Sequence, residues 1–291
     1  MNSIQLNKYI YNTHPIYNGL FSTIYRCNSI DNKDIPLVIK KIKKNINKRY
    51  IHDELIIMKS IHHPHILSLL DAFYKKKKIH LVLNYCNGGN LLQYIKSNDT
   101  TYNKLYIYQI IDGFTHLYLK NILHRDIKPE NILIHNHTIK ICDFGLSKTM
   151  YLDNIQNSIC GVPDYIAPEL FKDNVYNRQS DIWSLGVILY EILHKEHPYP
   201  NKNYSELIHI LKQTDINGFQ DIEVENNIDN KIFYIIQKML VVNYKNRLHW
   251  AELIHFSKNC LYIKKTLIKS TPKSTSLPIN INLTDNINNN F

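Results

Sequence analysis

The sequence has little cysteine and no long hydrophobic run, and these two absences exclude several classes of protein. The five cysteines are scattered and odd in number: Cys27, Cys86, Cys142, Cys160 and Cys260. No CxxC pair occurs, so we expect neither a disulfide framework nor a cysteine zinc site, and a reducing compartment fits this pattern. Because no run of eighteen apolar residues is present, we expect no transmembrane helix. The first eight residues have no apolar signal core and no glycine at position 2, so we expect neither secretion nor myristoylation.

Acidic residues are also in the minority, which gives the chain a net charge of +10. Basic residues gather at 40–49, 75–78 and 258–273. Such clusters occur in proteins that bind nucleic acids or acidic partners, but they are also typical of solvated turns and helix faces. No nucleic-acid-binding motif accompanies the charge, so we favour the solvated surface. A salt-dependent binding measurement would distinguish the two interpretations.

The order of the predicted elements indicates two regions of different character. A chain of 291 residues can form one two-lobed domain or two domains. Between residues 13 and 83 we predict strands at 16–26, 37–41, 66–70 and 79–83, and a helix at 49–61. Residues 75–78 form the predicted turn between the last two strands. This region is therefore expected to be a small sheet with one helix.

From about residue 91 the pattern becomes helical. We predict helices at 103–119, 181–193, 205–213 and 231–240, and the second should be buried because it is apolar on nearly all sides. Residues 84–89 form the linker between the two regions. After about residue 265 the chain is rich in Ser, Thr, Asn and Lys, so we expect a mostly disordered tail over 265–291.

The most informative segment is 124–131, which reads HRDIKPEN. An aspartate, a lysine two residues later and an asparagine five residues later can serve one phosphoryl transfer. Asp126 would orient a hydroxyl nucleophile and accept its proton, Lys128 would neutralise charge on the phosphoryl group, and Asn131 would hold a metal. Asp143 follows a predicted strand at 138–142 and begins the sequence DFG, which offers a second metal ligand.

These motifs, followed by Ala167, Pro168 and Glu169, resemble the catalytic loop, metal loop and APE motif of eukaryotic-type protein kinases. The resemblance covers about residues 10–260. It implies an α+β fold with two lobes: a small N-terminal antiparallel sheet with one helix (about 10–83), a hinge (84–89) and a larger, mainly helical C-terminal lobe (about 90–262). Lys128 resembles the serine/threonine class. The cofactors implied are ATP and Mg²⁺, and the implied partner is a protein with a Ser or Thr acceptor.

The resemblance also identifies a nucleotide site in the N-terminal lobe. Lys40 follows a strand-like run and matches the lysine that contacts ATP phosphates. Glu54 lies where the family has its helix glutamate, so we expect an ion pair that holds Lys40 against the phosphates. Kinases that resemble this chain have a GxGxxG loop, whereas only Gly19 remains here and Tyr17 and Ser22 replace the other two glycines. Because backbone N–H groups bind the phosphates, the loss could stiffen the loop or weaken ATP binding without abolishing it.

The implied adenine contacts are apolar and would equally suit a simple core position. Ile24 and Val38 would lie above the ring and Leu133 below it. Leu83 falls at the gatekeeper position, and the backbone of residues 84–86, which include Tyr85 and Cys86, would hydrogen-bond the adenine edge.

Further positions match structural parts of the family fold. The stacked spine of an assembled kinase corresponds to Met58, Leu69, His124, Phe144 and Asp181, and we interpret His124 as structural. Glu169 is expected to pair with Arg247.

The substrate side shows one departure and two candidate specificity positions. Val162 stands where the family has a threonine that bridges the catalytic Asp and Lys, so we expect reduced turnover. Glu130 and Glu191 match positions that recognise basic residues upstream of the phosphoacceptor, although Asn90 lacks the charge of a third such position. Ser158 is the predicted activating phosphosite.

The phosphate on Ser158 would bind Arg125, with Lys148 as a second candidate cation, while Ser147, Thr149 and Tyr151 are alternative acceptors.

Two functions from different classes therefore remain. We expect a serine/threonine kinase, because the six catalytic and nucleotide-anchoring positions are intact. The alternative is a pseudokinase scaffold, which the degenerate glycine loop and Val162 favour. The 161–169 segment, which matches a peptide platform, disfavours a small-molecule kinase. The abundance of Ile, Asn, Lys and Tyr suits an AT-rich genome of a large DNA virus or a protist, so we expect a cytoplasmic or nuclear location in its cell or host, or the virion, with no membrane partner. The sequence does not predict an oligomeric state.

Overall fold

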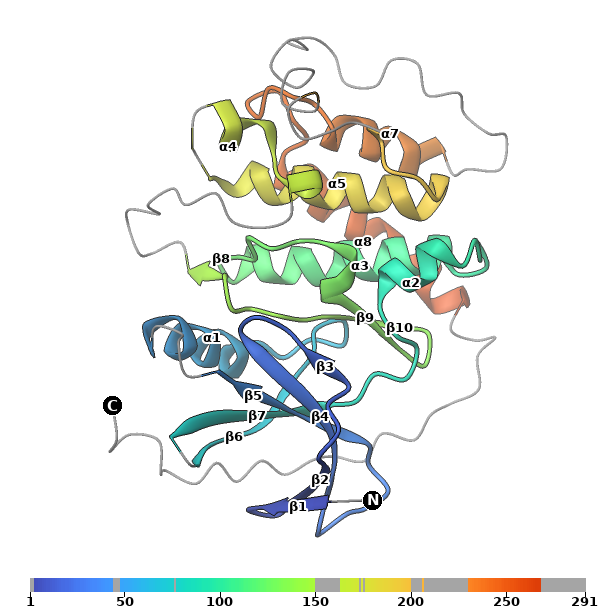
Figure 1. Ribbon diagram of the computed structural model, residues 1–291. Coiled ribbons are helices and arrows are strands. Elements are labelled where there is room, and N and C mark those ends of the chain that lie inside the picture. Colours follow the sequence, from blue (N-terminus) through green and yellow to red (C-terminus); the bar gives the residue numbers. More distant parts are fainter. Residues whose placement is uncertain are drawn as a thin grey trace.

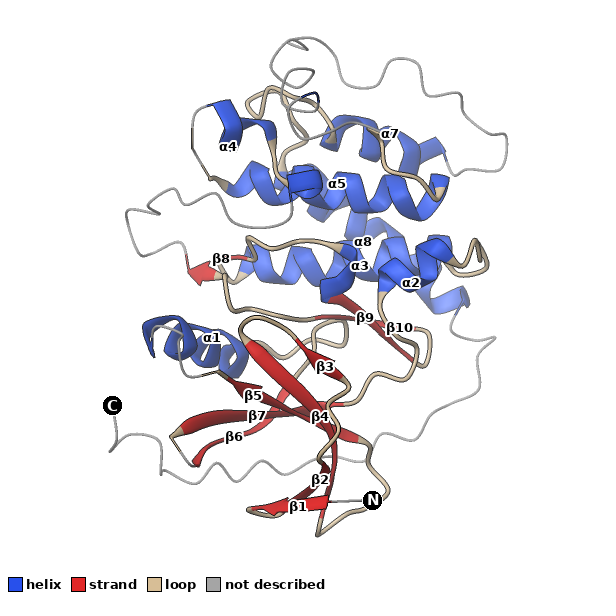
Figure 2. Ribbon diagram, viewed as in Figure 1, coloured by secondary structure: helices blue, strands red, loops and turns tan. Residues whose placement is uncertain are grey.

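The computed structural model describes residues 3–43, 48–75, 77–149, 163–172, 174, 176–199, 206 and 230–267. It has two lobes, which Figure 1 shows one above the other. Strands dominate the N-terminal lobe and helices dominate the C-terminal lobe, as the colouring of Figure 2 makes plain. The predicted two-lobed α+β architecture is confirmed.

The N-terminal lobe is a curled antiparallel sheet with one helix against it. Its strands are β1 (Ser3–Leu6), β2 (Tyr9–Asn12), β3 (Tyr17–Asn18), β4 (Ser22–Ser29), β5 (Leu37–Ile42), β6 (Leu69–Lys75) and β7 (Lys78–Asn84). They are ordered β1-β2-β4-β5-β7-β6, and β3 pairs with β4. The helix α1 (Lys48–Ser60) follows β5.

The sheet contributes side chains to two cores, because successive side chains of a strand point to opposite faces. On β5, Val38 and Ile42 pack toward α1 in the main core, while Leu37 and Ile39 belong to a second, smaller core. The second core also contains side chains of β1, β2, β4, β6 and β7. The period of two places Lys40 on the same face as Val38, toward α1.

The C-terminal lobe is built around two long helices. Its helices are α2 (Leu91–Lys96), α3 (Asn103–Leu119), α4 (Pro168–Lys172), α5 (Arg178–His194), α7 (Asn230–Met239) and α8 (Trp250–Leu267). Helix α5 is buried over most of its length, as predicted. Among the described residues, every helix is too short or too polar to span a bilayer.

Four short strands and two 3₁₀ turns carry the loops between the helices: β8 (Ile122–Leu123), β9 (Ile132–His135), β10 (Thr138–Ile141), β11 (Lys148–Thr149), η1 (Pro129–Asn131) and η2 (Pro163–Tyr165). β9 pairs with β10 and β8 with β11. These hairpins position the loops that carry the candidate catalytic residues.

The structure corrects the sequence analysis at several elements. The strand predicted at 66–70 has the wrong bounds: Ile66 makes only an isolated bridge to Ile141, and the strand β6 begins at Leu69. The strand predicted at 16–26 is divided into β3 and β4 by a tight turn. The hairpin β1–β2 was missed, although the alternation in 4–6 and the aromatic and β-branched residues at 9–11 are strand signals.

Two other expectations fall largely beyond the described part of the chain. Of the helix predicted at 205–213, only residue 206 is described, and it is helical. Helix α8 extends to Leu267, and the rest of the expected tail lies outside the described residues.

Candidate active site

A lysine and two carboxylates form the first part of the site. Nζ of Lys40 lies 2.8 Å from Oε1 of Glu54 on α1 and 2.9 Å from Oδ1 of Asp143 in the loop after β10. The predicted pair of Lys40 and Glu54 is confirmed, and the ion pair with Asp143 ties the N-terminal lobe to the C-terminal lobe. Glu54 is 4% exposed, so its charge is compensated by Lys40 rather than by bulk water.

The charges of this triad are mutually stabilised. Burial alone would lower the pKa of Lys40, but the carboxylates of Glu54 and Asp143 outweigh it and raise that pKa above its ordinary value. In turn, the positive charge of Lys40 lowers the pKa of Asp143 against the opposing effect of its partial burial. Lys40 is therefore a cation and Asp143 an anion at neutral pH, as phosphate and metal binding require.

The second part of the site is the loop between β8 and η1, where Asp126 is held from two sides. Nζ of Lys128 donates to Oδ2 of Asp126 at 2.7 Å. Nδ2 of Asn131 donates to the same oxygen and to the backbone carbonyl of Asp126, both at 2.8 Å. Asp126, Lys128 and Asn131 thus lie together, as expected. The η1 turn brings Asn131 back toward Asp126.

Buried polar contacts fix the backbone of this loop. The carboxylate of Asp181 on α5 accepts hydrogen bonds from the backbone N–H groups of His124, at 3.0 Å, and Arg125, at 3.3 Å. Nε2 of His124 is 3.2 Å from the carbonyl of Cys142, and Nδ1 is 3.4 Å from the N–H of Asp126. A neutral histidine protonated on Nε2 satisfies both contacts, which supports the structural role predicted for His124.

The loop that carries Asp143 packs directly on this framework. The rings of His124 and Phe144 lie 5.3 Å apart, and the hydroxyl of Ser147 donates to the carbonyl of His124 at 3.0 Å. Arg125 and Asp143 both have positive φ, at 67° and 68°, a region that non-glycine residues seldom occupy. Such backbone conformations persist where surrounding contacts enforce them and are frequent at functional sites.

The spine residues share one buried environment. His124, Phe144, Asp181 and Met58 are buried, and Leu69 packs against the same core as a partly buried residue.

The oxygen atoms present fit a magnesium–nucleotide complex. Asn131 directs its amide nitrogen at Asp126, so its carbonyl oxygen is the atom that could coordinate a cation. The carboxylate side chain of Asp143 is 47% exposed. Among the described residues, no group of three or more His, Cys, Asp or Glu side chains is arranged to hold a metal. Mg²⁺ typically takes only one or two protein ligands and completes its octahedron with waters and substrate phosphates, so the two oxygens suffice.

The residues expected to surround adenine belong to the main core or pack against it. Val38, Leu83 and Cys86 are buried in the main core, and Ile24, Tyr85 and Leu133 pack against it while partly exposed. Val38 on β5 and Leu83 on β7 lie directly opposite each other in the sheet. The N–H of Tyr85 donates to the carbonyl of Pro36 at 3.0 Å, and the guanidinium of Arg26 lies 3.9 Å from the Tyr85 ring centroid. Sequence reasoning missed the Arg26 contact, for which the sequence offers no signal.

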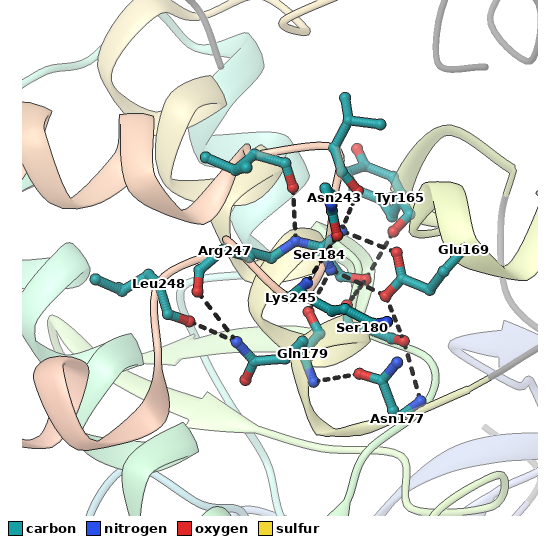
Figure 3. Close-up of polar contacts among 12 residues, drawn as sticks. Tyr165, Glu169, Asn177, Gln179, Ser180, Ser184, Asn243, Lys245, Arg247 and Leu248 are labelled. Carbon is teal, nitrogen blue, oxygen red and sulfur yellow. Dashed lines mark hydrogen bonds and ion pairs between the residues drawn. The ribbon is translucent and has the colours of Figure 1, made fainter. Parts of the chain in front are cut away.

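The predicted pair of Glu169 and Arg247 is confirmed as a bidentate ion pair. The two guanidinium nitrogens lie 2.9 and 2.8 Å from the carboxylate oxygens, and both side chains are almost completely buried. Figure 3 shows Arg247 reaching from the loop before α8 to Glu169 and to the start of α5, where it also donates to the carbonyl of Gln179. This cluster fastens the segment that begins at Pro163 to the helical lobe.

A buried acidic group lies near the substrate side. The hydroxyl of Tyr165 lies 3.2 and 3.1 Å from the two oxygens of Glu191. Burial raises the pKa of Glu191 to about 7; the Tyr165 hydrogen bond opposes this rise, and the charges of Glu130 and Asp164 reinforce it. Glu130 and Glu191, the two candidate specificity positions, are therefore close enough for the charge of one to affect the other. Tyr165 was not identified from the sequence, although it lies just before the APE motif.

Several predicted positions lie outside the described residues: Tyr151, Ser158 and Val162. Of the residues expected to serve the phosphosite, Arg125 is buried, with its guanidinium carbon 5.2 Å from the Tyr176 ring centroid, and Lys148 begins β11.

A lysine anchored by a helix glutamate, an aspartate held by a lysine and an asparagine, and a metal-loop aspartate on a two-lobed fold define the protein kinase class. The chain belongs to the protein kinase family, since the family model described as "Protein kinase domain" matches residues 12–257. Its relatives place this kinase domain in the serine/threonine group.

Three of these relatives are each 34% identical to this chain. A serine/threonine-protein kinase of Acanthamoeba polyphaga mimivirus aligns over 76% of this chain and 57% of its own length. The Aurora kinase of Eremothecium gossypii aligns over 77% and 59%, and a serine/threonine-protein kinase of Xenopus laevis over 67% and 44%. The chain therefore spans about half the length of these relatives.

Proposed function

We propose that this chain transfers the γ-phosphate of ATP to a serine or threonine hydroxyl of a protein, with Asp126 as the base. The observation that carries this proposal is the position of Asp126, whose Oδ2 is held by both Lys128 at 2.7 Å and Asn131 at 2.8 Å. These contacts fix the carboxylate orientation, and positioning together with electrostatic stabilisation accounts for most phosphoryl-transfer catalysis.

The proposed reaction assigns a separate task to each charged group. The acceptor oxygen forms a bond to the γ-phosphorus as the bond from that phosphorus to the bridging oxygen of ADP breaks. Asp126 accepts the hydroxyl proton late in the step, because the transition state is loose. Lys128 neutralises charge on the transferred group, and Lys40, held by Glu54, binds the phosphates. Asn131 and Asp143 would hold Mg²⁺, which supplies charge neutralisation for the phosphate oxygens.

The surroundings of Glu191 support a preference for basic substrates. The charges of Glu130 and Asp164 act on Glu191 and help to raise its pKa, so this region concentrates acidic side chains. A basic side chain of a substrate peptide would provide the opposite charge. We therefore propose that peptides with Arg or Lys upstream of the acceptor are preferred.

The experiment that tests the function is an assay with γ-labelled ATP, Mg²⁺ and a Ser/Thr peptide library. Asp126→Asn keeps the shape of the side chain and should lower kcat by about 10²- to 10⁴-fold, the usual contribution of a general base. Nucleotide affinity and the folding transition should stay near wild type. If the wild-type protein binds ATP but shows no turnover that Asp126→Asn removes, the pseudokinase alternative is favoured instead.

The remaining proposals concern the extent of the domain and its setting. We propose a kinase domain over residues 10–262, followed by a polar tail over residues 265–291. We propose action in the cytoplasm or nucleus. The mimivirus relative supports a viral source, and for a viral protein the place of action would be the host cell or the virion.

A further inference from the structure

The turn between β3 and β4 has an aromatic ring packed against its one glycine. Tyr17 is 57% exposed, yet its ring folds back over Gly19. A Cβ atom placed on Gly19 would lie 2.6 Å from Cε1 and 2.7 Å from Cζ of Tyr17, and would also collide with the hydroxyl oxygen. The ring therefore occupies the position where a side chain at residue 19 would be.

This contact gives the one remaining glycine of the loop a steric role. The φ angle of Gly19 is not in the left-handed region, so another residue could adopt its backbone conformation. What Gly19 provides is close approach, the second use of glycine. The approach here is by Tyr17 of the same chain, which stands at one of the two positions where a glycine is lost.

Other contacts hold the turn closed around this ring. The N–H of Gly19 donates to the carbonyl of Ser22 at 3.0 Å, and the hydroxyl of Thr23 donates to Oδ1 of Asn18 at 3.2 Å. Beyond the turn, the N–H of Lys43 donates to the carbonyl of Phe21 at 2.9 Å, which fastens the tip of the loop to the end of β5. The loop is thus braced by its own side chains and by the strand that carries Lys40.

We propose that Tyr17 is a positioning residue that orders this loop for nucleotide phosphates and thereby compensates for the missing glycines. The inference rests on the proposed function, because it assumes that backbone N–H groups of the loop bind ATP. A flexible loop must lose conformational freedom when it closes on phosphates, and a preorganised loop avoids part of that cost. The ring of Tyr17 supplies the preorganisation by packing on the backbone at Gly19.

The test is a double-mutant cycle read out as KM for ATP, kcat and the dissociation constant of a fluorescent ATP analogue. Tyr17→Ala removes the ring, and Gly19→Ala should displace it, since the phenol is the free end of an exposed side chain. Each variant should raise KM for ATP and the dissociation constant about three- to tenfold, the equivalent of ordering one or two side chains, with little change in kcat. Both substitutions remove the same contact. The double variant should therefore bind ATP no more weakly than the weaker-binding of the two single variants.

Two further variants separate this role from a general effect on the sheet. Tyr17→Phe keeps the ring and should therefore have the wild-type KM for ATP. Tyr74→Ala, which removes a tyrosine of nearly equal exposure (58%) on β6, should leave all three parameters unchanged.

The possible outcomes distinguish this inference from the proposed function. If wild type transfers phosphate and Tyr17→Ala leaves KM unchanged, or if the effects of Tyr17→Ala and Gly19→Ala simply add, Tyr17 does not position the loop. If Tyr17→Phe behaves as Tyr17→Ala, the hydroxyl rather than the ring acts, and the packing explanation is overturned. If wild type neither binds ATP nor transfers phosphate, the proposed function itself fails.

Discussion

At the residue scale, one lysine side chain balances the charge of two carboxylates in the site. Lys40 is the shared partner of Glu54 and Asp143, and it is largely buried. We predict that Lys40→Met lowers kcat/KM by at least about 10²-fold, comparable to removing one preorganised charge from an active site. Steady-state assays against Lys41→Met, the next residue on β5, would measure this. Comparable losses in both variants would show that the effect comes from the strand and not from the ion pair.

A second residue-scale prediction concerns pH. Burial raises the pKa of Glu191 to about 7 from an ordinary value of 4.5. Between these values the folded protein binds more protons at this site than the unfolded chain, so stability falls as pH rises. The contribution is fully present below pH 4.5 and is lost as pH passes through 7. Glu191→Gln, which keeps an acceptor for Tyr165, should flatten the fall of the unfolding free energy over this window.

Urea titrations of both proteins at several pH values would measure that difference. An identical pH slope in wild type and Glu191→Gln would mean that Glu191 does not titrate in this range. For a basic peptide substrate, the KM of wild type should decrease as pH rises through 7, because Glu191 then gains its charge. The KM of Glu191→Gln should lack this change.

At the element scale, Arg247 joins the loop before α8 to α4 and α5. Besides Glu169, its guanidinium contacts the carbonyls of Val241 and Gln179, and the side chain has no exposed surface. Arg247→Ala would leave the Glu169 carboxylate buried without its ion-pair partner, so we predict a loss of about 3–5 kcal/mol in unfolding free energy. Arg247→Lys should recover only part of it, because an ammonium cannot reproduce the planar fork. Chemical denaturation would measure these values.

Lys245 provides the control for this prediction, because it lies exposed in the same loop. Lys245→Ala should change stability by less than about 0.5 kcal/mol, as surface substitutions usually do. A cost below 1 kcal/mol for Arg247→Ala, by the same measurement, would contradict the structural role of the pair.

The curl of the N-terminal sheet is a second property of elements rather than residues. β2 and β6 are not neighbours in the sheet, yet the hydroxyl of Tyr9 donates to Oδ2 of Asp71 at 2.8 Å and its ring stacks on Phe73. Tyr9→Phe should therefore cost about 1.5–3 kcal/mol, the value of a hydrogen bond to a charged group. Tyr74→Phe on the exposed side of β6 is the matched control. Equal unfolding free energies for the two variants would show that the hydrogen bond does not hold the curl.

At the scale of the whole molecule, nucleotide binding should link the two lobes. Lys40 comes from one lobe, whereas Asn131 and Asp143 come from the other, and Leu67 donates its N–H to the carbonyl of Ile141 at 2.9 Å across the junction. Mg·ATP at a hundred times its dissociation constant should add about 2.7 kcal/mol to the folded state. We predict a raised Tm with Mg·ATP and a smaller increase in EDTA. In Asp143→Asn, magnesium should add little to the increase in Tm that ATP produces. If magnesium raises the Tm of this variant as much as that of wild type, Asp143 is not a metal ligand.

The candidate site was largely predictable because its chemistry depends on short spacings. Asp126, Lys128 and Asn131 lie within six residues, and one loop followed by a 3₁₀ turn is enough to bring them together. The pair of Lys40 and Glu54 could be predicted only through the family resemblance, since the two residues are fourteen positions apart and meet across β5 and α1. The strand at 66–70 could not be placed because an apolar run does not reveal whether it pairs with a neighbour or packs as a loop.

The sequence by itself determined the family, the division into a strand-rich and a helical region, and the side chains available for the proposed transfer, because side-chain chemistry and local periodicity are properties of the chain. The tertiary structure decided which distant groups meet: Asp143 with Lys40, Tyr9 with Asp71, and Glu191 with Tyr165. It also decided that Gly19 leaves space for the ring of Tyr17, which folds over it, and is not needed for its φ angle. Contacts of this kind depend on the curl of the sheet and the direction of side chains, and neither is encoded in the spacing of residues along the chain.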